Sequence, residues 1–177
     1  MTRRLPLALL LTLPLAALAA GDGTPPAAPN QMAGTWRMVS ATLETGGRIE
    51  RPYGPTPRGM LVFTDDLHFV EVLTDAGSPR FASDARGGGT DEENRRAMAS
   101  SIGFFGTYTV DAAGRFQGNR VEGATFPNWI GAVRTTADLD MRVEGDCMFE
   151  TFLRPDGGRL QATFVRASAP AAACSDR

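Results

Sequence analysis

The chain has 177 residues, a formal net charge of −2 at pH 7 and 42% hydrophobic residues, which suits one folded domain with its own core. Every basic residue is an arginine, and no basic patch indicates a nucleic-acid-binding surface. After the first 20 residues, no stretch is long and apolar enough to be a membrane span. We therefore expect a single domain that has no nucleic-acid partner.

Residues 1–20 have the pattern of a secretory signal peptide. Arg3 and Arg4 provide the positively charged start, an apolar segment follows over residues 5–18, and Ala17-Leu18-Ala19 is a small-x-small cleavage site. The apolar segment is too short to span a membrane. We therefore expect a secreted or periplasmic protein without a transmembrane segment after signal cleavage.

The rest of the chain divides into a leader, a domain and a tail. Residues 21–31 are rich in Gly, Pro and Ala, which predicts a disordered leader. The folded domain is expected over residues 32–166, and residues 167–177 form an Ala/Ser-rich tail. In an oxidising compartment Cys147 and Cys174 could form a disulfide that pins this tail to a strand; two free thiols are the alternative.

Short runs rich in β-branched and aromatic residues recur along the domain, separated by turn residues. This regular spacing of short strands predicts an all-β fold, an up-and-down antiparallel barrel. The predicted strands cover residues 34–43, 59–64, 68–73, 104–110, 115–124, 132–139, 140–143, 147–153 and 159–166.

One predicted helix interrupts the strands. Thr90 and Glu93 have the spacing of a capping box, which predicts a helix over residues 91–101. Its apolar positions, which include Met98, are few, so we expect a short lid or plug on the barrel and not a core helix. The proline-rich segment 49–58 is predicted to be a loop or an edge over a barrel mouth, because proline cannot donate to a strand ladder.

The first and last strands carry a pattern that resembles the lipocalin signature. The first strand begins Gly34-Thr35-Trp36, and Arg166 ends the last strand. In a closed barrel these two strands pair, since closure removes the sheet edges. The resemblance implies that Trp36 plugs one barrel end and that Arg166 stacks on its ring, an arrangement favoured by cation–π attraction.

Further motifs extend this resemblance to about residues 32–166. They are Pro57-Arg-Gly-Met-Leu, Thr90-Asp-Glu-Glu, Phe105-Gly-Thr-Tyr, Val121-Glu-Gly and Phe126-Pro-Asn-Trp-Ile-Gly. In this order they are similar to the lipocalin-like domain family of bacteria and fungi. The resemblance implies a calycin-type barrel with an internal cavity but supplies no activity. Family members often carry adjacent histidines before Val-Glu-Gly, where this chain has Asn119-Arg120.

Polar residues on the predicted strands are the candidates for catalysis. His68, Glu71, Tyr108 and Glu122 are the acid–base candidates, because one face of each strand must look into the barrel. His68 is the only histidine, and no His-x-His or Glu-x-x-His spacing exists, so we expect no metal site. We also expect no organic cofactor.

A ligand site is predicted in the space between the strands. Arg120 and Glu122 share one strand face and would be its polar pair; the alternative is that Val121 looks inward and the two charges face water. The predicted ligand-binding residues are Met38, Phe63, Tyr108, Arg120, Glu122, Trp129 and Arg134.

Two functions remain open for such a barrel. The first is binding of a small hydrophobic or amphipathic molecule, mostly apolar, in the barrel cavity. The second is a cofactor-independent cyclase or isomerase that uses the same cavity to hold a reactive conformer. The fold does not decide between them. An apolar lining favours carriage, whereas converging acid–base groups with perturbed pKa values favour chemistry.

Overall fold

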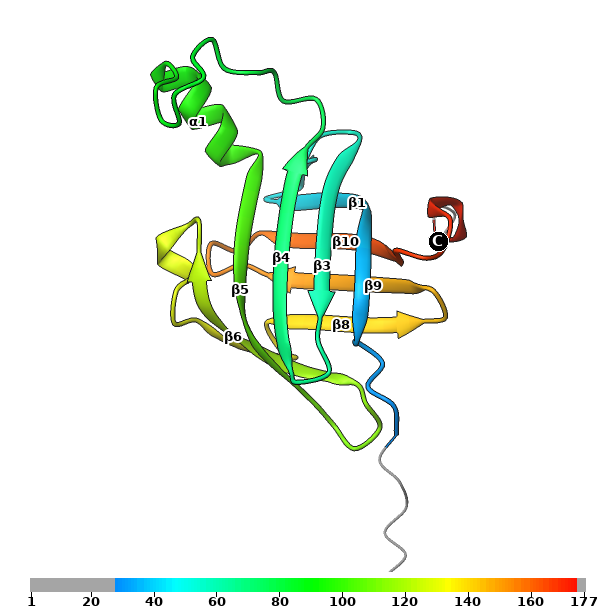
Figure 1. Ribbon diagram of the computed structural model, residues 1–177. Helices are drawn as coiled ribbons and strands as arrows, with labels where there is room; N and C mark the ends of the chain where they lie inside the picture. Colours follow the sequence, from blue (N-terminus) through cyan, green and yellow to red (C-terminus); the bar gives the residue numbers. More distant parts are fainter. Residues whose placement is uncertain (1–27, 175–177) are drawn as a thin grey trace, which may run out of the picture.

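The computed structural model describes residues 28–174. The predicted signal peptide, residues 1–20, lies outside the described residues. A ten-stranded antiparallel sheet follows the order β7-β6-β5-β4-β3-β1-β10-β9-β8, with β2 paired beside β1, and curls into a nearly closed barrel (Figure 1). The strands are β1 (Gly34–Thr45), β2 (Arg48–Glu50), β3 (Pro57–Phe63), β4 (His68–Asp75), β5 (Ser101–Val110), β6 (Phe116–Ala124), β7 (Val133–Thr135), β8 (Leu139–Glu144), β9 (Cys147–Leu153) and β10 (Arg159–Arg166).

Strand β1 joins the two layers of the barrel. Figure 1 shows β3, β4 and β5 crossing β8, β9 and β10, with β1 bending from one layer into the other. The first residues of β1 pair with β3, and the ladder with β10 runs from Trp36 to Glu44 with a register shift between Met38 and Ser40. Such an irregularity bends a strand, which lets one strand serve both layers.

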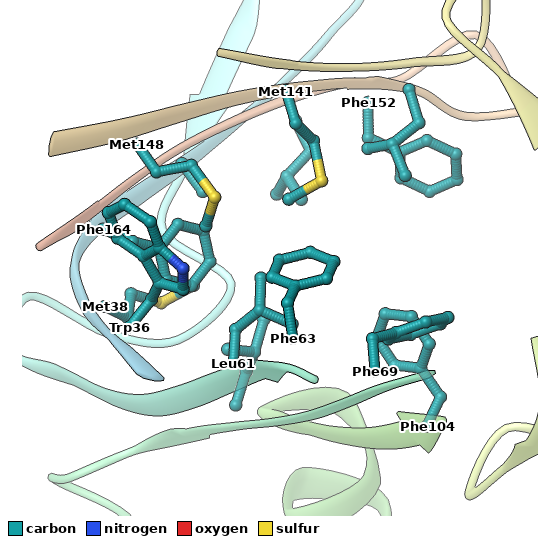
Figure 2. Close-up of a cluster of buried hydrophobic side chains, with 14 of the residues drawn as sticks. Trp36, Met38, Leu61, Phe63, Phe69, Phe104, Met141, Met148, Phe152 and Phe164 are labelled. Carbon is teal, nitrogen blue, oxygen red and sulfur yellow. The ribbon is translucent and has the colours of Figure 1, made fainter. Parts of the chain in front are cut away.

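Alternate side chains on each strand point into the barrel. On β4, Phe69, Glu71 and Leu73 are buried whereas the residues between them are exposed. Apolar side chains from the two layers meet in the interior, where Leu61 and Phe63 of β3 face Met141 of β8 (Figure 2). Burial of these side chains supplies most of the stabilisation of the barrel.

Trp36 and Arg166 close one end of the barrel, as the sequence predicts. Trp36 is fully buried, and its Nε1 donates a hydrogen bond of 2.8 Å to the Met32 carbonyl. The guanidinium carbon of Arg166 lies 4.2 Å from the centre of the indole ring. The same guanidinium donates to the carbonyls of Ala33 and Gln31, so it holds the chain leading into β1.

Two residues just before the predicted domain start contact the barrel. Gln31 donates its backbone N–H to the Gly114 carbonyl, and the Asn30 amide donates to the Tyr108 hydroxyl. The predicted leader therefore ends with two residues that are bound to the barrel. At the other end a disulfide joins Cys147 of β9 to Cys174, whose Cα atoms are 5.7 Å apart, and holds the tail helix η2 (Ala171–Cys174) against the sheet.

Helix α1 (Asp91–Ala99) begins at the predicted cap but does not enter the barrel. Thr90 accepts from the Glu93 backbone N–H and Glu93 accepts from the Thr90 backbone N–H, which completes the capping box. None of the helical residues is buried, and the helix stands beyond the upper end of β5 (Figure 1). The helix does not plug the interior, because it has too few apolar side chains to fill one; it lies outside the barrel at one end, as the lid alternative of the prediction has it. No helix among residues 28–174 is long and apolar enough to cross a membrane.

We expect amide hydrogen exchange in α1 to be much faster than in β5. The helix is fixed by its capping box and few side-chain contacts, whereas β5 is paired on both sides by β4 and β6. Amides that open locally exchange faster than those that need global unfolding. Exchange measured by mass spectrometry on peptides from 91–99 and 104–110 tests this, and equal protection of the two segments would contradict it.

Candidate functional site

A cavity of about 520 Å³ opens at the α1 end of the barrel. Four connections and the start of β5 supply its walls: the β2–β3 loop, the end of α1, the 3-10 turn η1 (Pro127–Trp129) and the β9–β10 turn. Its volume lies within the ~300–1,000 Å³ usual for small-molecule sites. The lining residues are Pro52, Tyr53, Met98, Ala99, Ser101, Ile102, Phe126, Asn128, Trp129, Arg154, Pro155 and Asp156.

The proline-rich loop places Tyr53 in this wall. The tyrosine is only 4% exposed, so the predicted loop over a barrel mouth turns its aromatic side chain inward. The turn depends on Gly54, whose φ of +70° favours glycine and where a Cβ atom would lie 2.3 Å from an Asp75 carboxylate oxygen. The loop conformation is therefore fixed by residues outside the cavity.

Arg134 of β7 lies buried within a group of aromatic rings below the cavity. Its guanidinium carbon is 4.7 Å from the ring centre of Trp129, 4.6 Å from that of Phe152 and 5.5 Å from that of Phe104. Trp129 also meets Phe104 and Phe152 edge to face. Trp129, whose ring contacts the Arg134 guanidinium, also lines the cavity.

Two buried glutamates, Glu71 of β4 and Glu150 of β9, interact electrostatically with Arg134. Burial raises the pKa of Glu150 to about 7, against the attraction of Arg134. Burial and the charge of Glu150 raise the pKa of Glu71 well above its usual value. One arginine therefore faces two carboxyl groups that retain protons far more readily than exposed glutamates. Burial also lowers the pKa of Arg134.

Some polar atoms in and near this cluster make no hydrogen bond within the described part of the chain. Among the described residues, the buried Oε2 atom of Glu150 and the buried Nε atom of Arg154 have no hydrogen-bond partner. Burial, followed by the charges of Glu71 and Glu150, raises the pKa of Tyr53, so its hydroxyl stays protonated and available as a donor. Groups of this kind can bind a polar atom of a ligand or take part in proton transfer.

The structure brings only some of the predicted site residues to the cavity. Trp129 lines it, and Arg134 and Glu71 lie in the cluster beneath. Met38 and Phe63 are core residues, 7% and 3% exposed, and line neither cavity described here. Tyr108 is buried near the opposite end, where its hydroxyl donates to the Thr64 carbonyl and accepts from Asn30.

The predicted inward pair, Arg120 and Glu122, is wrong in orientation. Both side chains are exposed, and Val121 between them is 1% exposed. An apolar side chain gains from burial at this position, whereas an inward charge needs a partner. His68 is exposed as well, and its Nδ1 lies 3.0 Å from the Asp66 carbonyl. Among the acid–base candidates, Glu71 alone belongs to the interior cluster.

Sequence reasoning missed Glu150, Tyr53 and Arg154. Glu150 could have been found, because it alternates with Met148 and Phe152 on β9 and therefore shares their inward face. Tyr53 and Arg154 lie in a loop and a turn, where period-two alternation gives no information. A second cavity of about 430 Å³ lies between the leader, β6 and β8, and none of the predicted site residues lines it.

Comparison with known families identifies this architecture. A family model described as a lipocalin-like domain matches residues 33–146. The chain belongs to the lipocalin-like domain family. Comparison with curated proteins gave no match. The matched region ends just before β9, although β9 and β10 complete the barrel. The lipocalin-like fold is one that generally binds small molecules.

Proposed function

We propose that this lipocalin-like protein binds a small, mostly apolar molecule in the cavity at the α1 end. The cavity itself carries the proposal, because its volume of about 520 Å³ and its Ile102, Phe126 and Trp129 walls suit such a ligand. The interior between the sheet layers is occupied by core side chains (Figure 2). The ligand therefore lies at the barrel mouth rather than at the centre predicted from the sequence.

We expect Ala99→Trp to abolish or strongly weaken the binding of an apolar dye. Ala99 is exposed at the end of α1 and lines the cavity, so a tryptophan there fills ligand space without entering the core. Overfilling a packed site costs ~1–3 kcal/mol, which corresponds to roughly 5-fold to 150-fold in dissociation constant. Fluorescence titration with Nile red measures the dissociation constant of the dye for the wild type and for Ala99→Trp.

Two controls separate this effect from a general loss of folding. Ala112→Trp places the same ring in the exposed β5–β6 turn, and Arg120→Ala alters the outward face of β6; both are expected to bind the dye as the wild type does. The absence of saturable binding in the wild type would end the proposal. Equal binding by Ala99→Trp would move the site away from this cavity.

The second candidate function is a cofactor-independent cyclase or isomerase. The observation that favours it is the convergence of Glu71, Glu150 and Tyr53, whose pKa values are all raised, near one end of the barrel. Native mass spectrometry of protein from its own host identifies a bound molecule. Recovery of that molecule unchanged after incubation supports carriage, whereas its conversion by the wild type but not by Glu150→Gln supports catalysis.

We also propose that the protein is secreted or periplasmic. The Cys147–Cys174 disulfide supports this, because such bonds persist in oxidising compartments. The N-terminal sequence pattern agrees with export. Sequencing the N-terminus of protein from its own host tests the proposal, and a chain that retains residues 1–20 would contradict it.

A further inference from the structure

Within residues 28–174, one cationic side chain that lines the cavity makes no hydrogen bond and no ion pair. Arg154, in the turn after β9, lines the wall, and its buried Nε donates to no group among the described residues. Its side chain forms no ion pair within the described part of the chain. A buried guanidinium N–H that makes no hydrogen bond is unfavourable, so this group is suited to an acceptor brought by a ligand.

Asp156, the acidic residue in the same cavity wall, already accepts a hydrogen bond from the protein. Asp156 Oδ1 accepts a 3.0 Å hydrogen bond from the Gly158 backbone N–H. The Arg154 backbone donates to the Gly158 carbonyl at 2.7 Å and accepts from Gly157, so the turn holds both residues in place. Asp156 therefore fixes the turn, and Arg154 presents its side chain from a rigid backbone.

Tyr53 adds a second donor to the Arg154 side of the cavity. Tyr53 is 4% exposed as a residue, its hydroxyl makes no hydrogen bond among the described residues, and the positive charge of Arg154 acts on it electrostatically. A guanidinium and a hydroxyl together can serve the two oxygens of a carboxylate.

Resting on the proposed function, we propose that the ligand is an apolar carboxylic acid whose carboxylate binds Arg154 and Tyr53. The hydrocarbon part lies against Ile102, Phe126 and Trp129 across the cavity. The head group supplies the acceptor that Arg154 lacks, and the tail is removed from water. The site thus selects an amphipathic anion over a neutral molecule of the same length.

Calorimetric titration of the full mature protein with decanoate and with decanol tests this inference. The two probes have the same tail and differ at the head group. We expect the wild type to bind decanoate about tenfold or more tightly than decanol, because hydrogen bonds to charged groups contribute ~1.5–3 kcal/mol. Arg154→Met keeps the apolar stem and should lose this preference, while its affinity for decanol changes less than about twofold.

Matched variants make the result specific to Arg154. Arg159→Met removes an exposed arginine from the neighbouring strand β10 and should leave both affinities unchanged. Tyr53→Phe removes one hydroxyl and should weaken decanoate binding several-fold; it carries the test if Arg154→Met does not fold. Equal binding of acid and alcohol by the wild type, or an unaltered preference in Arg154→Met, would overturn the inference but keep the proposed function. No binding of either probe or of Nile red would overturn both.

Discussion

Replacing Trp36 by alanine is expected to lower the free energy of unfolding by ~3–5 kcal/mol, the range for truncating a fully buried large aromatic side chain. The variant loses the ring that fills one barrel end. It also leaves the Met32 carbonyl without its donor and the Arg166 guanidinium without the indole 4.2 Å away. Urea unfolding followed by circular dichroism measures the change.

Phe105→Ala is the matched control, because Phe105 is an aromatic residue of β5 that is 51% exposed. Its removal is expected to lower stability by about 1 kcal/mol or less, as for most surface substitutions. If Trp36→Ala and Phe105→Ala unfold at the same urea concentration, Trp36 does not close the barrel in the way described.

The second large effect is a loss of stability as the pH rises from about 5 to 8. Glu150 has its pKa raised in the folded protein to about 7 from an ordinary value of 4.5, so the folded state holds a proton that the unfolded state releases. The stabilisation is complete below the unfolded value and disappears as the pH passes about 7. The shift corresponds to roughly 3 kcal/mol, and Glu71 changes stability in the same direction.

Glu150→Gln should remove the part of this pH dependence that Glu150 contributes, because the amide stays neutral throughout. The variant is expected to gain stability over the wild type at high pH and to match it near pH 5. Glu122→Gln, on the exposed face of β6, should keep the wild-type profile. The four carboxylates whose pKa values are lowered, Asp66, Glu93, Asp111 and Asp138, change stability in more acidic solution. An unchanged profile in Glu150→Gln would place the titrating group elsewhere.

The sequence predicted the strands and the barrel because short runs of β-branched and aromatic residues recur at regular spacing between turn residues. Phe69, Glu71 and Leu73 share the inward face of β4, and the Thr90–Glu93 capping box marks the helix start. Closure predicted that the first and last strands pair, and the resemblance to the lipocalin signature implied that Trp36 and Arg166 meet; the ladder, which places Trp36 opposite Arg166, confirms both.

The site was harder to predict, because alternation gives two faces without saying which one looks inward. Arg120 and Glu122 share a face with each other, but Val121 occupies the interior. Loop residues such as Tyr53 and Arg154 come together only once four separate connections meet at one barrel end. The lengths of those connections and their hydrogen bonds decide the outcome, and neither follows from the period of a strand.

The pairing of β1 with β10 has a consequence for how this chain folds. The meander from β3 to β6 is built from neighbouring segments, whereas the longest ladder joins the first strand of the barrel to the last. Such a ladder can form only after β10 has been synthesised, and the entropy of closing so large a loop slows the search for it. Trp36 therefore stays without Arg166 until late in folding, and the barrel is expected to assemble in milliseconds to seconds rather than microseconds.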